Sequence, residues 1–214
     1  MPHVDNPDIP GYKIIRRLGE DVETMTGLTF IARQESTNTR RLVKILKPSF
    51  VRNVQNKALG TSFLQDFADE AKISLEVSHP NVIKVIDRGA TAYDGLERVP
   101  YYVMELVEPK KDLLEFSQDA QIDTIIDVVQ QVLEGTLSLH KKNVVHMDLK
   151  PANILVNTID NTAKIIDLGF AKVLRKRANK TDFTYIRATK GYVPPNLHLG
   201  AHALTKEFIV SGVG

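Results

Sequence analysis

The sequence predicts an α+β fold in which an antiparallel sheet with one helix is followed, after a change near residue 108, by a mainly helical region. Two observations lead to this prediction. Before residue 108, short segments rich in β-branched and aromatic residues alternate with Gly, Pro, Asn or Asp. From residue 121, apolar residues instead recur at helical spacing over about five turns. This change of period indicates two lobes.

The first lobe is expected to contain five strands. Each candidate is six or seven residues long and is bounded by residues that favour turns. Their length and composition suit neighbouring strands of one antiparallel sheet. The expected strands are residues 12–18, 28–33, 40–46, 82–87 and 101–107.

Two helices are expected, one in each lobe. The first covers residues 62–77 and carries an apolar stripe of Phe63, Leu64, Phe67, Ala71 and Leu75. The second begins near residue 121. Its apolar residues at helical spacing are Ile122, Ile125, Ile126, Val129, Val132, Leu133 and Leu137.

Composition excludes several classes of protein. The chain has 214 residues, 43% of them hydrophobic, which is enough for a core in one domain or two small lobes. Lys plus Arg number 28 and Asp plus Glu number 26, so charge gives no reason to expect nucleic acid or an anionic membrane as a partner. There is no cysteine and no apolar run long enough to span a membrane. The chain opens with a polar segment. We therefore expect a cytoplasmic protein without a membrane segment.

One charged residue conflicts with the apolar stripe of the first helix. At about 100° per residue, Glu70 lies between Phe63 and Phe67 when viewed down the helix axis. A buried carboxylate needs a cationic partner, because burying it alone costs several kcal/mol. Lys44 interrupts an apolar strand in the same way, so we expect a buried Lys44–Glu70 pair. For either residue alone, a snorkelling lysine or an edge glutamate would be the simpler interpretation.

Three oxygen-bearing side chains surround a predicted hairpin. Asp148 and Asn153 lie five residues apart in a loop before the strand ILV, and Asp167 follows the strand KII. A loop followed by a hairpin can bring the three side chains together, and their oxygens suit Mg²⁺. Asp148 remains available to accept a hydroxyl proton and orient an attacking oxygen. Lys150 supplies positive charge for a phosphoryl group in transit.

The order of these residues resembles the protein kinase superfamily, in its eukaryotic-like Ser/Thr branch. The matching residues are Lys44, Glu70, His146-x-Asp148-Leu149-Lys150-x-x-Asn153 and Asp167-Leu168-Gly169, with family-like context in HPNVIKVID (79–87) and LHKKNVVH (139–146). The resemblance covers nearly the whole chain. It implies a two-lobed protein-kinase-like fold, with a polar N-terminal tail at 1–10, an N-lobe at 11–107 and a partial C-lobe at 108–214.

The resemblance also implies a role for each matching residue. Lys44 would hold the α- and β-phosphates of ATP and pair with the glutamate of the first helix. Asp148 would be the catalytic base, and Lys150 would contact the transferring phosphoryl group. Asn153 and Asp167 would be the Mg²⁺ ligands.

Further positions follow from the same resemblance. Met104 would stand at the gatekeeper position, Glu105 and Val107 would offer backbone groups to adenine, and Leu155 would form the floor beneath the ring. These hydrophobic assignments fit a plain core equally well. His146 is expected to support the metal-binding loop and to do no acid–base chemistry.

The loop that covers the phosphates departs from the family. Where the family has G-x-G-x-x-G, this chain reads GEDVETMTG from Gly19 to Gly27, which is longer by three residues and acidic. Side chains and negative charge should hinder the close approach of backbone N–H groups to phosphates. We expect an expanded lid that retains its first and last glycines and weakens ATP binding.

Met147 is a second departure, because most regulated members of the family have arginine there. The planar guanidinium of arginine binds a phosphate on the activation segment, and a thioether cannot. We therefore expect that no phosphorylation switch acts through Met147.

The end of the chain resembles only part of the larger lobe. Residues 188–196, ATKGYVPPN, resemble the substrate-positioning segment, and Thr189 within it is expected among the catalytic residues. Residues 205–214 resemble the opening of the central helix of that lobe. The lobe is therefore expected to be incomplete, and a partner or a missing C-terminal segment would cover the apolar surface left exposed.

Three functions follow from these patterns. The leading one is a protein serine/threonine kinase that uses ATP and Mg²⁺ and acts on a protein substrate, with Lys150 arguing for Ser or Thr. The alternative is a catalytically impaired, pseudokinase-like module that binds a nucleotide or a partner; the acidic lid favours it and the intact motif residues oppose it. The third, a small-molecule kinase of similar fold, is disfavoured by Lys150 and the TKGY segment.

Overall fold

The computed structural model describes residues 6–19, 27–52, 60–168 and 172–173. The chain divides into two compact units. The first comprises the chain up to Glu76 together with Ile83–Leu106, and the second comprises Val77–Val82 and the chain from Val107 onward. Thr189, the interior of the lid between Gly19 and Gly27, and the segments 188–196 and 205–214 lie outside the described residues.

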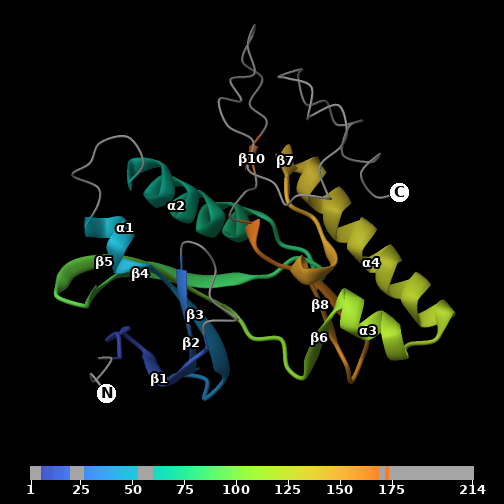
Figure 1. Cartoon of the computed structure of the whole chain (residues 1–214), viewed down its shortest axis with the longest axis horizontal. Coiled ribbons are helices and arrows are strands. Elements are labelled where there is room, and N and C mark those ends of the chain that lie inside the picture. Colours follow the sequence, from blue (N-terminus) through green and yellow to red (C-terminus); the bar gives the residue numbers. More distant parts are fainter. Residues whose placement is uncertain (1–5, 20–26, 53–59, 169–171, 174–214) are drawn as a thin grey trace, which may run out of the picture. The chain divides into compact units, whose positions relative to one another are not determined.

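Five strands of the first unit form one antiparallel sheet, as the sequence predicts. Their order in the sheet is β1-β2-β3-β5-β4, and every neighbouring pair is antiparallel (Figure 1). The strands are β1 (Tyr12–Arg17), β2 (Gly27–Gln34), β3 (Arg40–Leu46), β4 (Val85–Tyr93) and β5 (Leu96–Glu105).

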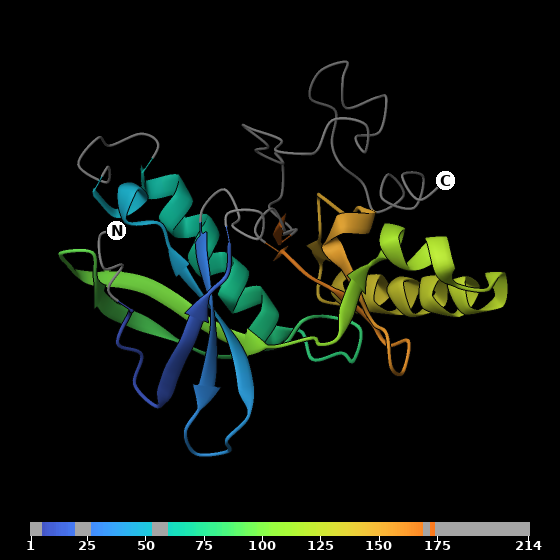
Figure 2. The ribbon, with the colours of Figure 1, turned by 60° about the horizontal axis from the view of Figure 1, so that its bottom comes forward.

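The last two strands of this sheet differ from the prediction. Strands were expected at 82–87 and 101–107, but β4 begins and ends later and β5 begins earlier. The cause is a two-residue turn at Asp94 and Gly95, whose φ angles are 52° and 73°. Positive φ at both positions is the geometry of a type I′ turn, which Asp-Gly favours. The turn lets β4 and β5 pair as one long hairpin, drawn in green (Figure 2).

Two helices accompany the sheet: the short α1 (Pro48–Arg52) and the long α2 (Gly60–Glu76). The ring centroids of Phe67 on α2 and Tyr102 on β5 are 4.9 Å apart, and both side chains are buried. Leu75, which helical spacing places on the buried stripe, is 43% exposed, whereas Ile73 is buried. The buried face of α2 is therefore not centred where the apolar pattern alone puts it.

The described part of the N-terminal tail is attached to the sheet. Ile9 is 2% exposed and forms an isolated bridge with Tyr12. The hydroxyl of Thr91 on β4 donates a hydrogen bond to the carbonyl of Asp8. The tail, which is polar in composition, therefore contributes one buried apolar side chain, that of Ile9.

The second unit combines two helices with short strands. The predicted hairpin is present as β8 paired with β9; β6 pairs with β8, and β7 pairs with β10. The elements are β6 (Lys110–Asp112), α3 (Leu113–Asp119), α4 (Ile122–Lys141), β7 (Val144–Val145), the 3-10 helix η3 (Pro151–Asn153), β8 (Ile154–Asn157), β9 (Ala163–Ile165) and β10 (Lys172–Val173). Among the described helices of both units, none is long and apolar enough to cross a membrane.

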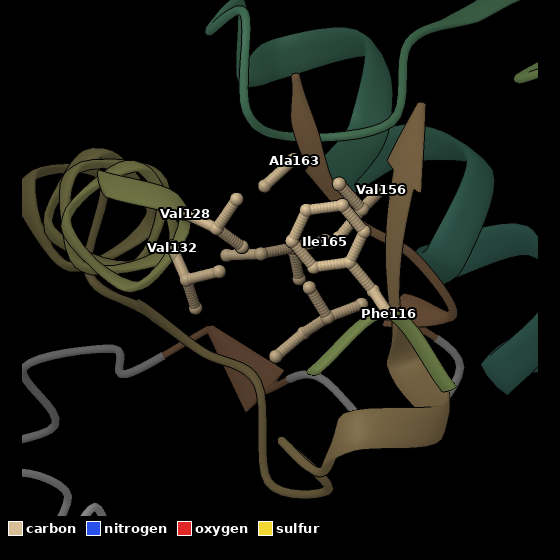
Figure 3. Packing of buried hydrophobic residues seen from close by; sticks show 7 residues of the cluster. Phe116, Val128, Val132, Val156, Ala163 and Ile165 are labelled. Atoms are coloured by element: carbon tan, nitrogen blue, oxygen red, sulfur yellow. The ribbon is translucent and has the colours of Figure 1, made fainter. Parts of the chain in front are cut away.

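One face of α4 packs against this hairpin and α3 to form the core of the second unit. Val128 and Val132 of α4 point toward Ile165 of β9 and Phe116 of α3 (Figure 3). The full cluster is Phe116, Val128, Val132, Ile154, Val156, Ala163 and Ile165.

The apolar residues of α4 lie on two faces, and the sequence identified mostly the wrong one. The helix itself was predicted correctly, but five of the seven expected residues are 36–67% exposed: Ile122, Ile126, Val129, Leu133 and Leu137. The buried residues are Val128, Val132, Gly135, Thr136 and Leu139. The buried face includes the small residues Gly135 and Thr136, which allow close packing but interrupt the apolar pattern. A prediction from hydrophobic spacing therefore selects the face with more large apolar residues. The exposed residues, called the α4 stripe below, form an apolar surface along one side of the helix.

Neighbouring valines of α4 test this assignment. Val128→Ala should lower the free energy of unfolding by about 2 kcal/mol, because it opens a cavity beside Ile165. Val129→Ala should change it by less than about 0.5 kcal/mol, because little buried area is lost and alanine favours the helix. Denaturant titration followed by circular dichroism measures both. Equal losses for the two variants would contradict the packing described above.

Candidate functional site

In the first unit, Lys44 and Glu70 form the buried ion pair expected from the sequence. Lys44 extends from β3 and Glu70 from α2, and Lys44 Nζ lies 3.1 Å from each carboxylate oxygen of Glu70. The two residues are only 4% and 5% exposed. Because desolvated charges are stable only when closely matched, the pair fixes α2 against β3.

The sheet holds the aliphatic part of Lys44 between two buried neighbours. In the strand register, Thr29 of β2 lies opposite Lys44 on one side and Tyr102 of β5 lies opposite on the other. The ammonium group is also 5.7 Å from the centroid of the Tyr102 ring. The lysine therefore has a defined position within the sheet.

In the second unit, the loop between β7 and β8 brings together three of the predicted residues. Lys150 Nζ lies 2.9 Å from Asp148 Oδ2. Asn153 Nδ2 donates to the backbone carbonyl of Asp148 at 2.8 Å and to its Oδ2 at 3.2 Å. Asp148 and Asn153 are 4% and 6% exposed. One carboxylate oxygen is thus held by a cation and an amide, which fixes the Asp148 side chain.

The fourth predicted residue, Asp167, is fixed through the backbone that precedes it. The Ile166 N–H donates to the carbonyl of Asn153 at 2.9 Å. The carbonyl of Ile166 is 3.0 Å from His146 Nε2. The loop therefore holds both backbone groups of the residue immediately before Asp167.

His146 is buried, and both of its ring nitrogens face backbone groups. Its Nε2 faces the Ile166 carbonyl and its Nδ1 accepts the Asp148 N–H at 3.3 Å, which together define a neutral ring with the proton on Nε2. Burial lowers the pKa of His146 from its usual 6.5, although the Ile166 carbonyl and the charges of Asp167 and Asp148 act in the opposite direction. A neutral ring with both nitrogens engaged suits a supporting role.

Two residues of this region have backbone conformations that sequence patterns do not predict. Met147 and Asp167 have φ angles of 68° and 60°. Residues other than glycine rarely adopt this left-handed backbone conformation, and those that do are concentrated at functional sites. The conformation turns the chain sharply beside His146 and again after Ile166.

The donor set fits a hard divalent cation such as Mg²⁺. Because both contacts of the Asn153 amide to Asp148 come from Nδ2, its Oδ1 is the atom that remains for a cation. Asp167 is partly buried and follows Ile166, whose two backbone groups are held by Asn153 and His146, so Asp167 lies in the same region. An amide oxygen and a carboxylate, with further positions left for phosphate oxygens, are the ligands that Mg²⁺ prefers.

The remaining predicted residues lie on several elements. Met104 and Glu105 end β5; Glu105 Oε1 accepts the Lys84 N–H at 2.8 Å, and the Glu105 N–H donates to the Lys84 carbonyl at 3.0 Å. Val107 is 8% exposed and begins the main part of the second unit. Leu155 lies on β8, opposite Asp112 and Lys164 in register. Gly19 follows β1, and Gly27 opens β2.

Removing one member of the buried pair should be strongly destabilising. Lys44→Met takes away the cation that bonds both oxygens of Glu70 and should cost about 3–5 kcal/mol in the free energy of unfolding. The matched control is Lys72→Met, which breaks an exposed 4.0 Å pair with Glu76 on α2 and should cost less than about 1 kcal/mol. Chemical denaturation measures both, and similar losses would contradict the importance of burial.

The lowered pKa of His146 predicts a specific pH dependence of stability. Below pH 6.5 the unfolded chain binds a proton at this histidine that the folded chain does not, so the free energy of unfolding falls as pH is lowered. His146→Asn removes this dependence, so the stability gap between wild type and variant should narrow between about pH 7.5 and pH 5.5. Denaturation at a series of pH values measures the gap; a constant gap would rule out the buried neutral ring.

Comparison with known proteins agrees with this geometry. The protein kinase domain family matches residues 12–210. Similar proteins include the serine/threonine-protein kinase PknA of Mycobacterium tuberculosis, 31% identical over 77% of this chain and 36% of its own, and the mitogen-activated protein kinase mpk-1 of Caenorhabditis elegans, 35% identical over 72% of this chain and 34% of its own. A probable serine/threonine-protein kinase of Clostridium perfringens is 32% identical over 75% of this chain and 22% of its own. The chain thus spans about a third or less of the length of these curated relatives. It belongs to the protein kinase domain family.

Proposed function

We propose that this protein transfers the γ-phosphoryl group of ATP to a Ser or Thr hydroxyl of a protein substrate. The observation that carries the proposal is the contact of Lys150 and Asn153 with the buried Asp148, together with the bond from the Ile166 N–H, just before Asp167, to the Asn153 carbonyl. The similar proteins include serine/threonine kinases, which supports the same reaction class.

In the proposed reaction, Asp148 accepts the proton of the attacking hydroxyl and orients its oxygen. That oxygen forms a bond to the γ-phosphorus while the bond to the β,γ-bridging oxygen breaks, and ADP leaves with the bonding electron pair. Lys150, which already lies 2.9 Å from Asp148 Oδ2, offers positive charge to the phosphoryl group in transit. The Lys150–Asp148 contact also supports a fixed direction for the carboxylate.

Asn153 and Asp167 are proposed to hold Mg²⁺, through Oδ1 and the carboxylate respectively. When bound, Mg²⁺ supplies positive charge that offsets the negative charge of the phosphates. Lys44 is proposed to bind the α- and β-phosphates, and its buried bonds to Glu70 support a single orientation for its ammonium group. Gly19 and Gly27 are proposed to begin and end the phosphate-covering lid.

Four residues are proposed to bind the adenine ring: Met104, Glu105, Val107 and Leu155. The bonding of Glu105 to both backbone groups of Lys84 supports a rigid strand end at this point. Thr189 is proposed to act near the substrate hydroxyl. We also propose a cytoplasmic location, which the absence of cysteine supports.

A partner, or a further C-terminal segment, is proposed to cover the second unit. The α4 stripe supports this proposal, because five large apolar side chains on one helix are exposed in the described structure. The alternative of a binding module without turnover is less well supported, because both expected pairs are present, Lys44 bonded to Glu70 and Asn153 bonded to Asp148.

Transfer of labelled phosphate from ATP to a generic protein substrate tests the reaction. Asp148→Asn should lower the rate by about 10²- to 10⁴-fold, because the proton acceptor is lost while the shape of the side chain is kept. Asp160→Asn is the matched control, since Asp160 is exposed in the turn between β8 and β9, and it should transfer phosphate at the wild-type rate.

Transfer by Asp148→Asn at the wild-type rate would disprove the role of this residue. An inactive wild type that ATP and Mg²⁺ nevertheless protect against thermal unfolding would instead support the binding module.

A further inference from the structure

A buried asparagine outside the proposed reacting groups is bonded to β9. Asn81 is 4% exposed and lies in Val77–Val82, the short segment that belongs to the second unit. Its Nδ2 donates to Gln131 Oε1 at 2.9 Å and to the Ala163 carbonyl at 2.8 Å. Its own carbonyl accepts the Ile165 N–H at 2.9 Å. Asn81 therefore contacts β9 through both its side chain and its backbone.

Gln131 of α4 bonds to the same strand from the helix. Its Oε1 accepts hydrogen bonds from Asn81 Nδ2 and from the Ala163 N–H at 2.9 Å, and its Nε2 donates to the Asn161 carbonyl at 3.0 Å. Two donors at the oxygen and an acceptor at the nitrogen fix the orientation of the amide. Together, the two side chains hold both backbone groups of Ala163, and a network satisfied in this way is rigid.

Gly135, one helical turn beyond Gln131, allows this close approach. A Cβ atom at Gly135 would lie 2.9 Å from the carbonyl oxygen of Asn81 and 3.0 Å from Ile165 Cδ1. Any side chain there would push away the Asn81 segment or β9. The glycine and the amide network therefore act together in setting the position of the strand.

The strand held by this network leads directly to Asp167. Ala163 and Ile165 are fixed by Asn81 and Gln131, and the next residue, Ile166, is fixed by Asn153 and His146. The polypeptide entering Asp167 is thus held on two sides, by the α4 network and by the loop that carries Asp148. Only the second of these includes proposed catalytic residues.

We propose that Asn81 and Gln131 are positioning residues for phosphoryl transfer. They hold β9, and with it the backbone that enters Asp167, in the position that would let the Asp167 carboxylate and Asn153 Oδ1 bind the same Mg²⁺ ion. This inference rests on the proposed function. It adds a prediction that the proposed function does not make, namely that a glutamine on α4 controls how much Mg²⁺ the reaction requires.

The test compares Gln131→Leu with Gln130→Leu in the full chain. Gln130 is the exposed neighbour on the same helix and receives the same substitution. Gln131→Leu should raise the Mg²⁺ concentration needed for half-maximal transfer by about tenfold, as loss of an outer-shell partner commonly does. It should change the KM for ATP much less, because the hydrogen bonds of Gln131 reach none of the residues proposed to bind the nucleotide. Gln130→Leu should leave both constants unchanged.

A second measurement does not depend on activity. Amide hydrogen exchange at Ala163 and Ile166, followed by NMR without nucleotide, should be faster in Gln131→Leu than in Gln130→Leu. Gln131→Glu keeps the acceptor for the Asn81 amide and the Ala163 N–H but replaces the Nε2 donor to the Asn161 carbonyl with an oxygen, so it should restore only part of the wild-type Mg²⁺ requirement. If Gln131→Leu does not fold, Gly135→Ala serves in its place, because its added Cβ presses on the Asn81 carbonyl.

The outcomes separate this inference from the proposed function. A wild-type Mg²⁺ requirement in Gln131→Leu, or equal proportional changes in the Mg²⁺ and ATP constants, would overturn the positioning role while leaving phosphoryl transfer intact. A wild type that transfers no phosphate would instead count against the proposed function. The exchange rate of Ile166 then decides the positioning role by itself, and an unchanged rate would overturn it.

Discussion

The hydrogen bonds of Asn153 are the interactions on which the second unit's candidate site depends. The side chain amide holds the backbone and the carboxylate of Asp148, while the backbone carbonyl holds the Ile166 N–H. One residue therefore connects the loop that carries the proposed base to the strand end that carries the second proposed metal ligand. His146 repeats the connection in parallel, through the Ile166 carbonyl and the Asp148 N–H. Both links tie the backbone at Asp148 to the backbone of Ile166, the residue immediately before Asp167.

Burial explains why these links are rigid. Each polar group removed from water must find a partner within the protein, so a buried loop has few alternative arrangements of similar energy. The same reasoning applies in the first unit, where Lys44 and Glu70 satisfy each other between β3 and α2. Apolar strands and helices surround both places. The polar residues are thus a small set of fixed groups in an otherwise ordinary core, as expected when charged reactants have to be held without reorganisation.

The sequence predicts those features whose physical signal is local. Glu70 is recognisable because a charge stands on an apolar helix face, and the β8–β9 hairpin is recognisable from strand composition and motif spacing. The Asp94-Gly95 pair marks the β4–β5 turn, and the capping box of Asp112 and Glu115 marks the start of α3. A prediction made only from the period of apolar residues misses both of these local signals. Features that depend on contacts between distant segments left no such trace. Gln131 resembles any surface glutamine until α4 is placed against β9, and the period of α4 does not reveal which of its two apolar faces is buried.

A crystal structure of the chain with Mg²⁺ and a non-hydrolysable ATP analogue would test the central role of Asn153 most directly. The expected result is one Mg²⁺ ion bound by Asn153 Oδ1 and the Asp167 carboxylate, with Asn153 Nδ2 still donating to Asp148 and the Ile166 N–H still donating to the Asn153 carbonyl. A metal ion bound without Asn153, or an Asn153 amide turned away from Asp148, would contradict the account.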